Sequence, residues 1–345
     1  MWILLRLHLD ASEHLTLRAK PLLSMASIGG VEKTLEKIQK MIDSGSHYEA
    51  QQMLKTIYHR HKARKQISES YKILAEGAAM QLQHHQVTCG IELGLMLIEA
   101  LTTDKSMDVD EALAIVMTVL TCLPCKTKQS DDAASVSQQH NAVLDEEARY
   151  VAAAVKWAKR RGRQEGVRSI HALFAQHIWS TYGWRHMGRA NQYFVRSDDA
   201  VQFAGALVAC ARLAPVTEAD LFPTRAILQV LATATKESSV EQLEYAADLL
   251  EQCMQAAPEI KQYPLLNFTS LLLKALRMRS ATLVTFLKQK YAIALSRDDS
   301  FGVYLAQVER TYLGIGAESS GGIGGMLGGL LKSLMALDDD EKSDD

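Results

Sequence analysis

The sequence predicts an all-α protein, because apolar residues recur at steps of three and four along most of its 345 residues. Such a stripe gives a helix one apolar side that faces a core. No comparable run alternates with the two-residue period of a strand. The clearest stripes are Leu35/Ile38/Met41/Ile42, Ala148/Val151/Ala152/Val155, Ile227/Val230/Leu231/Ala234, Leu243/Ala246/Ala247/Leu250 and Leu265/Phe268/Leu272/Ala275/Leu276.

Residues that start and stop helices lie between these stripes. A cap residue three positions before Glu or Gln predicts helix starts at Ser46, Asp108 and Ser239. The residues expected to end helices or turn the chain are Gly45, Pro124, Pro215, Pro258 and Pro264. We therefore expect helices of about 12–20 residues joined by short turns, with antiparallel neighbours packed side by side.

The succession of helix pairs of similar length favours a solenoid over a closed bundle. Gly45, Tyr48 and Ala50, and later the Tyr182-Gly183-Trp184 segment, are typical of the small and aromatic contacts in tetratricopeptide pairs. No strict period near 34 residues holds. The prediction is a right-handed α-solenoid of degenerate tetratricopeptide-like helix pairs, interrupted by a mobile polar loop at residues 126–141.

Three segments follow from this pattern. Residues 1–27 form a flexible N-terminal extension, of which residues 1–24 are expected to be dispensable because Met25 is a plausible alternative start. Residues 28–313 form the solenoid, whose N-terminal half ends at about residue 160. Residues 314–345 form a glycine-rich, apolar and finally acidic tail whose apolar run is too short for a membrane span of roughly 20 residues.

The charge of the chain is unevenly distributed. The formal net charge is −2, yet the last eight residues hold six acids and one Lys, which leaves the other residues weakly basic. An acidic tail is typical of an interaction appendage. Five scattered cysteines, an odd number, favour a reducing compartment, and we expect a cytosolic protein.

No pattern indicates catalysis, a cofactor or a metal. The sequence shows no combination of nucleophile, base and oxyanion group. Cys122 and Cys125 form a C-x-x-C pair without a preceding strand or two further ligands at zinc spacing. His59 and His61 project in different directions on a helix, and His171 and His177 lack the i,i+4 spacing of a helical metal clamp. We expect no enzyme activity.

A basic cluster leaves one alternative function open. Lysine and arginine gather beside Trp157, at Lys156, Lys159, Arg160, Arg161, Arg163 and Arg168. A helical-repeat protein could use such a cluster to bind RNA or a larger complex. The pI of 6.6 and the absence of a nucleic-acid motif speak against RNA. A helix C-terminus near Gly162, where positive charge complements the dipole, explains much of the cluster.

Several blocks of residues carry a more specific pattern. They are Gly29-Gly30-Val31-Glu32, Gly45-Ser46-His47-Tyr48-Glu49-Ala50-Gln51-Gln52-Met53, Lys55-Thr56-Ile57-Tyr58-His59-Arg60, Ala154-Val155-Lys156-Trp157, His171 with Trp179, Tyr193-Phe194, Ser197-Asp198, Pro264-Leu265-Leu266-Asn267-Phe268, Gly325-Met326-Leu327-Gly328-Gly329-Leu330-Leu331 and Ser333-Leu334-Met335. In these blocks, which span about residues 28–335, the sequence resembles the Golgi-to-ER traffic protein 4 family.

The resemblance implies a cytosolic, non-catalytic α-solenoid adaptor in the targeting of tail-anchored membrane proteins to the ER. Its N-terminal helices would hold a homodimeric targeting ATPase. Its C-terminal half would hold a ubiquitin-like partner protein or a large ubiquitin-like BAG-type scaffold. Two partners held on one adaptor exchange a client faster, because each is at a high effective concentration near the other.

The resemblance to the family implies docking residues at only a few positions of this sequence. Arg60 matches a basic position of the ATPase-docking face, with Lys55 and Lys62 adding charge, and Glu92 and Glu99 match acidic positions that approach the ATPase elsewhere. The hairpin that some relatives have before the equivalent of Pro264 is missing here. The apolar tail residues are expected to dock the second partner because exposed apolar surface usually finds a cover; they are Leu330, Leu331, Leu334 and Met335.

Overall fold

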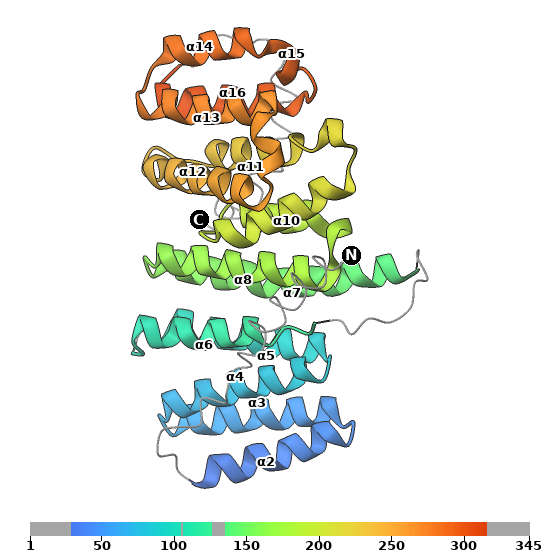
Figure 1. Cartoon of the computed structure of the whole chain (residues 1–345). Coiled ribbons are helices and arrows are strands. Elements are labelled where there is room, and N and C mark those ends of the chain that lie inside the picture. Colours follow the sequence, from blue (N-terminus) through green and yellow to red (C-terminus); the bar gives the residue numbers. More distant parts are fainter. Residues whose placement is uncertain (1–28, 105, 126–134, 316–345) are drawn as a thin grey trace. The chain divides into compact units, whose positions relative to one another are not determined.

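A computed structural model describes residues 29–104, 106–125 and 135–315. Every regular element in this part of the chain is a helix (Figure 1). The chain divides into two compact units at Gly162 and Arg163. The predicted all-α solenoid fold is confirmed. The extension 1–27 and all of the tail beyond Ile315 lie outside the described residues.

The first unit is two rows of antiparallel helices. Its helices are α2 (Gly29–Asp43), α3 (His47–Ala63), α4 (Ile67–Gln83), α5 (Val87–Thr103), α6 (Val109–Thr121) and α7 (Ser135–Arg160). Helices α2, α4 and α6 contact one another in sequence along one row, and α3, α5 and α7 do so along the other. Each helix therefore buries one stripe against the opposite row, as the three- and four-residue spacing predicts.

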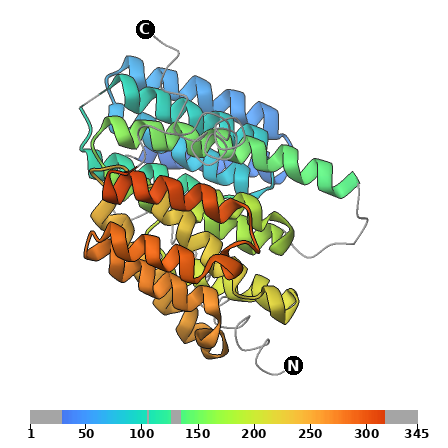
Figure 2. The same cartoon turned by 90° about the horizontal axis from the view of Figure 1, so that it is seen from above.

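The second unit, described by itself, is also built of packed helices, most of them shorter than those of the first unit. Its elements are α8 (Gln164–Tyr182), η1 (Trp184–His186), α9 (Met187–Phe194), α10 (Ala200–Leu213), η2 (Val216–Glu218), α11 (Leu221–Ala232), α12 (Ser239–Ala256), η3 (Pro258–Gln262), α13 (Pro264–Arg277), α14 (Ala281–Lys290), α15 (Ala292–Leu295), α16 (Ser300–Val308) and η4 (Glu309–Leu313). Helix α16 does not extend the stack but returns to pack on α11, as the second view also shows (Figure 2).

The turns between successive helices repeat one design. Five of them contain three residues, and the middle residue has a positive φ: Gly45 (87°), Lys65 (61°), His85 (60°), Gly162 (72°) and Arg279 (50°). A left-handed residue just after a helix lets its own amide and the amide of the following residue bond back to the last free carbonyls of the helix. The chain is thereby reversed within three residues.

Of the three predicted side-chain caps, at Ser46, Asp108 and Ser239, the structure shows one. Asp108 caps α6 as expected, accepting hydrogen bonds from the Asp110 and Glu111 amides at 2.9 and 3.2 Å. At Ser46 the helix starts as predicted, because the Ser46 carbonyl accepts from the Ala50 amide at 3.0 Å, but the Ser46 side chain makes no capping bond and its amide bonds the Met41 carbonyl of the preceding helix. The prediction for Ser239 is wrong, because it is already helical and its hydroxyl donates to the Lys236 carbonyl.

The predicted polar loop is also shorter than expected. Helix α7 begins at Ser135, so residues 135–141 are helical although their composition is polar. The apolar stripe starting at Leu144, which is fully buried, allows the helix to extend N-terminally from its packed part. Residues 126–134 lie outside the described part of the chain.

Close packing of α5 on α7 depends on the absence of a side chain at Gly94. A Cβ there would lie 2.8 Å from Cε2 of Tyr150. That ring is fully buried, and its hydroxyl donates to the Val116 carbonyl at 2.9 Å. The ring therefore joins α5, α6 and α7 and has no room to shift.

Replacing Gly94 with Ala should lower the free energy of unfolding by about 1–3 kcal/mol, because the overpacked ring outweighs the better helix propensity of Ala. Gly302→Ala is the matched control: Gly302 is also within a helix, but a Cβ there meets nothing within 4 Å. The control should raise the stability by roughly 0.5–1 kcal/mol. Urea unfolding measures both, and equal effects would contradict the packing argument.

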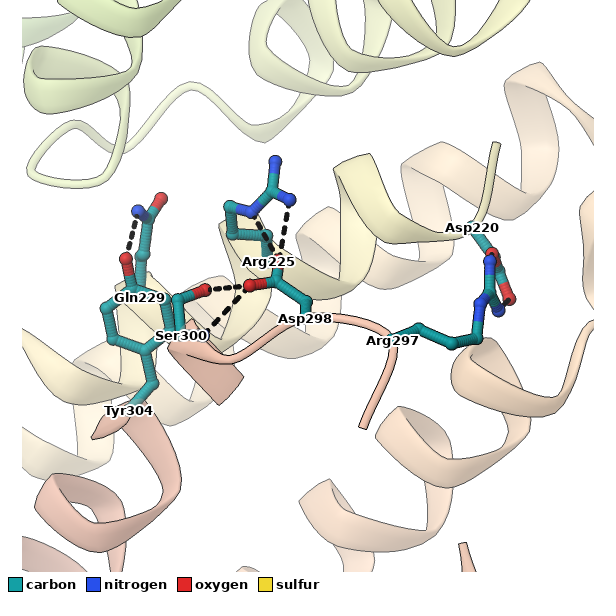
Figure 3. A network of polar contacts seen from close by, with 7 residues as sticks. All are labelled: Asp220, Arg225, Gln229, Arg297, Asp298, Ser300 and Tyr304. Carbon is teal, nitrogen blue, oxygen red and sulfur yellow. Dashed lines mark hydrogen bonds and ion pairs between the residues drawn. The ribbon is translucent and has the colours of Figure 1, made fainter. Parts of the chain in front are cut away.

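A polar network holds the α15–α16 turn against α11 within the second unit (Figure 3). Arg297 forms a two-pronged ion pair with Asp220, with N–O distances of 2.8 and 3.0 Å. The Arg225 guanidinium contacts Asp298 Oδ2 at 2.6 Å. Asp298 also accepts from the amide and the hydroxyl of Ser300. Two ion pairs thus fasten one short turn.

The two carboxylates of this network are largely buried. Asp220 and Asp298 expose 4% and 11% of their side chains. Burial by itself raises the pKa of Asp298, but hydrogen bonds from Ser300 and the Arg225 ion pair outweigh it and lower the pKa below its usual 3.8. Further along, Gln229 donates to the Tyr304 hydroxyl at 2.8 Å. Helix α16 is held by polar bonds as well as by its apolar side.

Asp298→Ala should destabilise the protein by about 1–3 kcal/mol, because it leaves Arg225 and Ser300 without their acceptor. Asp299→Ala, at the adjacent exposed acid that makes no capping bond, should change the stability by less than about 0.5 kcal/mol. The contribution of Asp298 is complete above pH 3.8 and is lost as the pH falls through its lowered pKa. Thermal unfolding scans between pH 2 and 7 would show the difference between the variants shrinking in acid.

Candidate docking surfaces

A groove lies between the first two helices of the first unit, α2 and α3. Its volume is about 420 Å³. It is lined by Lys33, Thr34, Lys37, Met53, Thr56, Ile57 and Arg60. Ile57 is buried and forms part of an apolar floor, whereas the three basic residues are exposed. We call this the N-terminal groove.

The sequence places these groups by simple helical spacing. Lys33 and Lys37 are four residues apart on α2, and Met53, Ile57 and Arg60 follow at steps of four and three on α3. Residues at such spacing share one face of a helix. The predicted site residue Arg60 therefore joins two lysines that our sequence analysis missed, although their i,i+4 spacing could have indicated them.

Lys55 and Glu92, predicted separately as docking residues, contact each other. Lys55 Nζ lies 2.5 Å from Glu92 Oε1, and Gln51 Nε2 donates to the other carboxylate oxygen at 2.7 Å. The Lys55 hydrogen bond is the main reason why the pKa of Glu92 is lowered. Glu92 keeps 53% of its side chain exposed and Lys55 only 19%. The pair ties α3 to α5, and Lys55 has less charge to offer a partner than the sequence indicated.

The other two predicted residues remain on the surface of the first unit. Lys62 is exposed, donates to the Tyr58 hydroxyl at 3.0 Å and lies over that ring, 5.4 Å from its centre. Glu99 is exposed on α5, seven residues after Glu92. The structure thus places Arg60 in the N-terminal groove, whereas Lys62 and Glu99 lie outside its lining.

The predicted tail residues Leu330, Leu331, Leu334 and Met335 lie outside the described residues. The second unit has an exposed apolar surface of its own on α14 and α15. Helix α14 buries Val284 and Leu287 but leaves Phe286 55% exposed, and Ile293 of α15 is 89% exposed. Lys290 lies 5.9 Å from the centre of the Phe286 ring. We call Leu283, Phe286 and Ile293 the α14–α15 surface.

The described residues contain neither a metal-binding cluster nor a membrane-spanning helix. Among them, no group of three or more His, Cys, Asp and Glu side chains could hold a metal ion. Burial raises the pKa of Cys122, the first cysteine of the C-x-x-C pair, which disfavours a reactive thiolate. None of the helices in residues 29–315 that the structure describes is long and apolar enough to cross a membrane.

Comparison with known proteins connects this fold to one family. The family model described as "Golgi to ER traffic protein 4" matches residues 64–335. "Protein GET4" of Arabidopsis thaliana is 25% identical over 316 residues, which cover 88% of this chain and 96% of the relative. The "Golgi to ER traffic protein 4 homolog" of Oryzias latipes is 26% identical and is covered to 92%, as is this chain.

A solved structure, "Crystal structure of C. therm. Get4", superposes with a TM-score of 0.65 at 18% sequence identity, covering 87% of this chain and 95% of that one. At this identity the likeness supports the fold alone. The family match, by contrast, extends over most of the chain and includes all of the second unit up to residue 335. The chain therefore belongs to the Golgi to ER traffic protein 4 family.

Proposed function

We propose that this protein is a non-catalytic cytosolic adaptor that delivers tail-anchored proteins to the ER by bringing a targeting ATPase and a second partner together. Family membership supports a role in Golgi-to-ER traffic. The N-terminal groove is the observation that carries the finer proposal. It combines an apolar floor with three exposed cations, which suits an acidic, partly apolar surface of a partner protein.

The electrostatics of the first unit indicate which groups meet the ATPase. Lys55 is already neutralised by Glu92, so Lys33, Lys37 and Arg60 carry the local positive charge that is available to a partner. Arginine is well suited to such contacts because its planar fork binds a carboxylate through two hydrogen bonds. Glu99 provides an exposed acid on α5 for a basic group of the same partner.

Arg60→Glu should weaken binding of the homodimeric targeting ATPase at least tenfold, because it places like charges opposite an acidic surface. Lys72→Glu makes the same charge change at an exposed position of α4 outside the groove and should leave the affinity within about twofold. Surface plasmon resonance with the purified ATPase measures both. The wild-type on-rate should fall as salt is raised.

Equal losses in the two variants would reject the groove as the docking site, since only net charge would then matter. Circular dichroism checks that both variants keep their helix content. Binding that is the same at 50 mM and 500 mM salt would also reject the electrostatic part of the proposal.

The second partner, a ubiquitin-like protein or a BAG-type scaffold, docks in our proposal on the C-terminal half of the chain. Two apolar features support this: the α14–α15 surface and the apolar tail residues near 330–335. An exposed apolar surface such as the α14–α15 surface usually marks a protein contact. Because the two docking regions belong to different units, one adaptor can hold both partners.

Ending the chain after Glu318 should abolish capture of the second partner and leave ATPase binding intact. Phe286→Asp in the full chain should reduce the capture, because it places a charge in the apolar contact. Leu213→Asp, an equal change at another exposed apolar residue of the second unit, is the control. A pull-down from cytosol with quantitative mass spectrometry identifies the partner, and unchanged capture by the truncated chain would disprove its docking on the tail.

A further inference from the structure

The ends of three helices bring basic residues together on one side of the first unit. Helix α5 contacts both α3 and α7 in the same row. Alternate helices of an antiparallel stack run in the same direction, so these three end on the same side. Five exposed or half-exposed cations lie at or just after the ends of α3 and α7: Lys62, Arg64, Lys65, Arg160 and Arg161. We call these five residues the basic edge.

Contacts of α7 with α5 show that their ends adjoin. The Trp157 indole N–H donates to the carbonyl of Leu101, in the last turn of α5, at 3.3 Å. Arg160 and Arg161 line a cavity of about 290 Å³ together with Thr102, which belongs to the same turn of α5. The two arginines therefore extend the surface that the end of α5 begins.

Asp104, which follows α5, brings an acid to the edge but is engaged within the protein. Its carboxylate accepts hydrogen bonds from the Tyr71 hydroxyl at 2.8 Å and from the amide and hydroxyl of Ser106, both at 2.9 Å. The Ser106 amide is the main cause of the lowered pKa of Asp104, and the charge of Lys62 contributes to it. The end of α3 is thus close to that of α5, and one carboxylate cannot neutralise five cations.

The helix dipoles do not neutralise the basic edge either. Each of the three helix C-termini carries a partial charge of roughly −0.5, so together with Asp104 they offset about half of the five positive charges. Further acids on this side belong to the other row of helices, at the starts of α4 and α6: Glu69, Asp108, Asp110 and Glu111. The row of α3, α5 and α7 therefore keeps an excess of positive charge.

Most of these cations are not neutralised inside the protein. In the part of the chain that the structure describes, Arg64, Lys65, Arg160 and Arg161 form no ion pair through their side chains. Lys62 donates to the Tyr58 hydroxyl, which carries no charge. Neighbouring charges within about 10 Å add to one another at physiological salt. The basic edge therefore attracts an anionic partner.

The basic edge offers little beyond charge. The Tyr58, Tyr71 and Trp157 rings near it expose at most 4% of their surface, so they cannot stack on the bases of a nucleic acid. The exposed uncharged residues beside the cations are small, Ala63 and Thr103 among them, and cannot form the apolar centre of a protein interface. Phosphates spread over a surface need only such long, charged side chains.

We propose that the basic edge binds the anionic surface of a membrane through the phosphates and carboxylates of its lipid headgroups. Clusters of four to eight Lys and Arg bind phosphatidylserine-rich surfaces, and each cation contributes. The contact is electrostatic and reversible, because the edge presents no large apolar side chain to the hydrocarbon. The proposal does not depend on the docking of the ATPase or of the second partner, since the four unpaired cations line neither surface.

Co-sedimentation of the full chain with unilamellar vesicles tests the proposal. Vesicles of phosphatidylcholine with about 30% phosphatidylserine should bind the chain, whereas vesicles of phosphatidylcholine alone should not. Raising the salt from about 50 mM to about 300 mM should weaken the binding at least fivefold, because salt screens the attraction.

Two pairs of substitutions probe the two ends of the basic edge. Arg64→Gln with Lys65→Gln, and separately Arg160→Gln with Arg161→Gln, should each weaken binding to the anionic vesicles at least fivefold. The four changes together should weaken it at least twentyfold. Circular dichroism checks that each variant keeps its helix content.

Lys261→Gln with Lys274→Gln is the matched control, because it removes two exposed charges from the second unit. It should change vesicle binding less than twofold. Equal losses in the control and in the edge variants would overturn the proposal, as would equal binding to neutral vesicles or a loss confined to one of the two pairs. A random-sequence RNA that binds the edge more tightly than the anionic vesicles do would assign it to nucleic acid and would also overturn it.

Discussion

The fold depends on a three-residue turn that reverses the chain after a helix. In the turn from α3 to α4, the Gln66 amide donates to the His61 carbonyl and the Lys65 amide to the Lys62 carbonyl, both at 3.0 Å. This is the Schellman pattern, and it satisfies carbonyls that the end of a helix leaves free. Repeated between α2 and α5, it sets each of these helices antiparallel to the one before, so that apolar stripes meet across two rows.

In the second unit, ion pairs and hydrogen bonds hold the last α-helix, α16, against α11. Helix α16 packs back on α11, and the ion pairs of Asp220 with Arg297 and of Arg225 with Asp298 hold the turn that leads into it. Buried ion pairs add little net stability but strongly disfavour arrangements in which one partner is left alone. They therefore favour the return of α16 onto α11, together with the Gln229–Tyr304 hydrogen bond and the apolar contacts between these helices.

The distribution of paired and unpaired charges is the most informative feature for function. Lys55 and Glu92 neutralise each other between α3 and α5, whereas the cations of the N-terminal groove stay exposed. Arg160 and Arg161 remain unpaired beside Trp157. A charge that is satisfied inside the protein stabilises the fold, and a charge that is left over is available for a partner. The sequence shows all of these residues alike as charged positions on helices.

The order and periodicity of the residues determined the helical class, the solenoid and the family, because apolar stripes such as Leu265, Phe268 and Leu272 and the colinear blocks are local or sequential signals. Only the tertiary structure decided that Lys55 meets Glu92 across 37 positions and that Asp220 meets Arg297 across 77. It also decided that Ser46 joins two helices through its backbone, with its amide bonded to Met41 of α2 and its carbonyl to Ala50 of α3, and not through a capping side chain. Side-chain pairing between distant helices depends on their packing register, which periodicity along one helix does not contain.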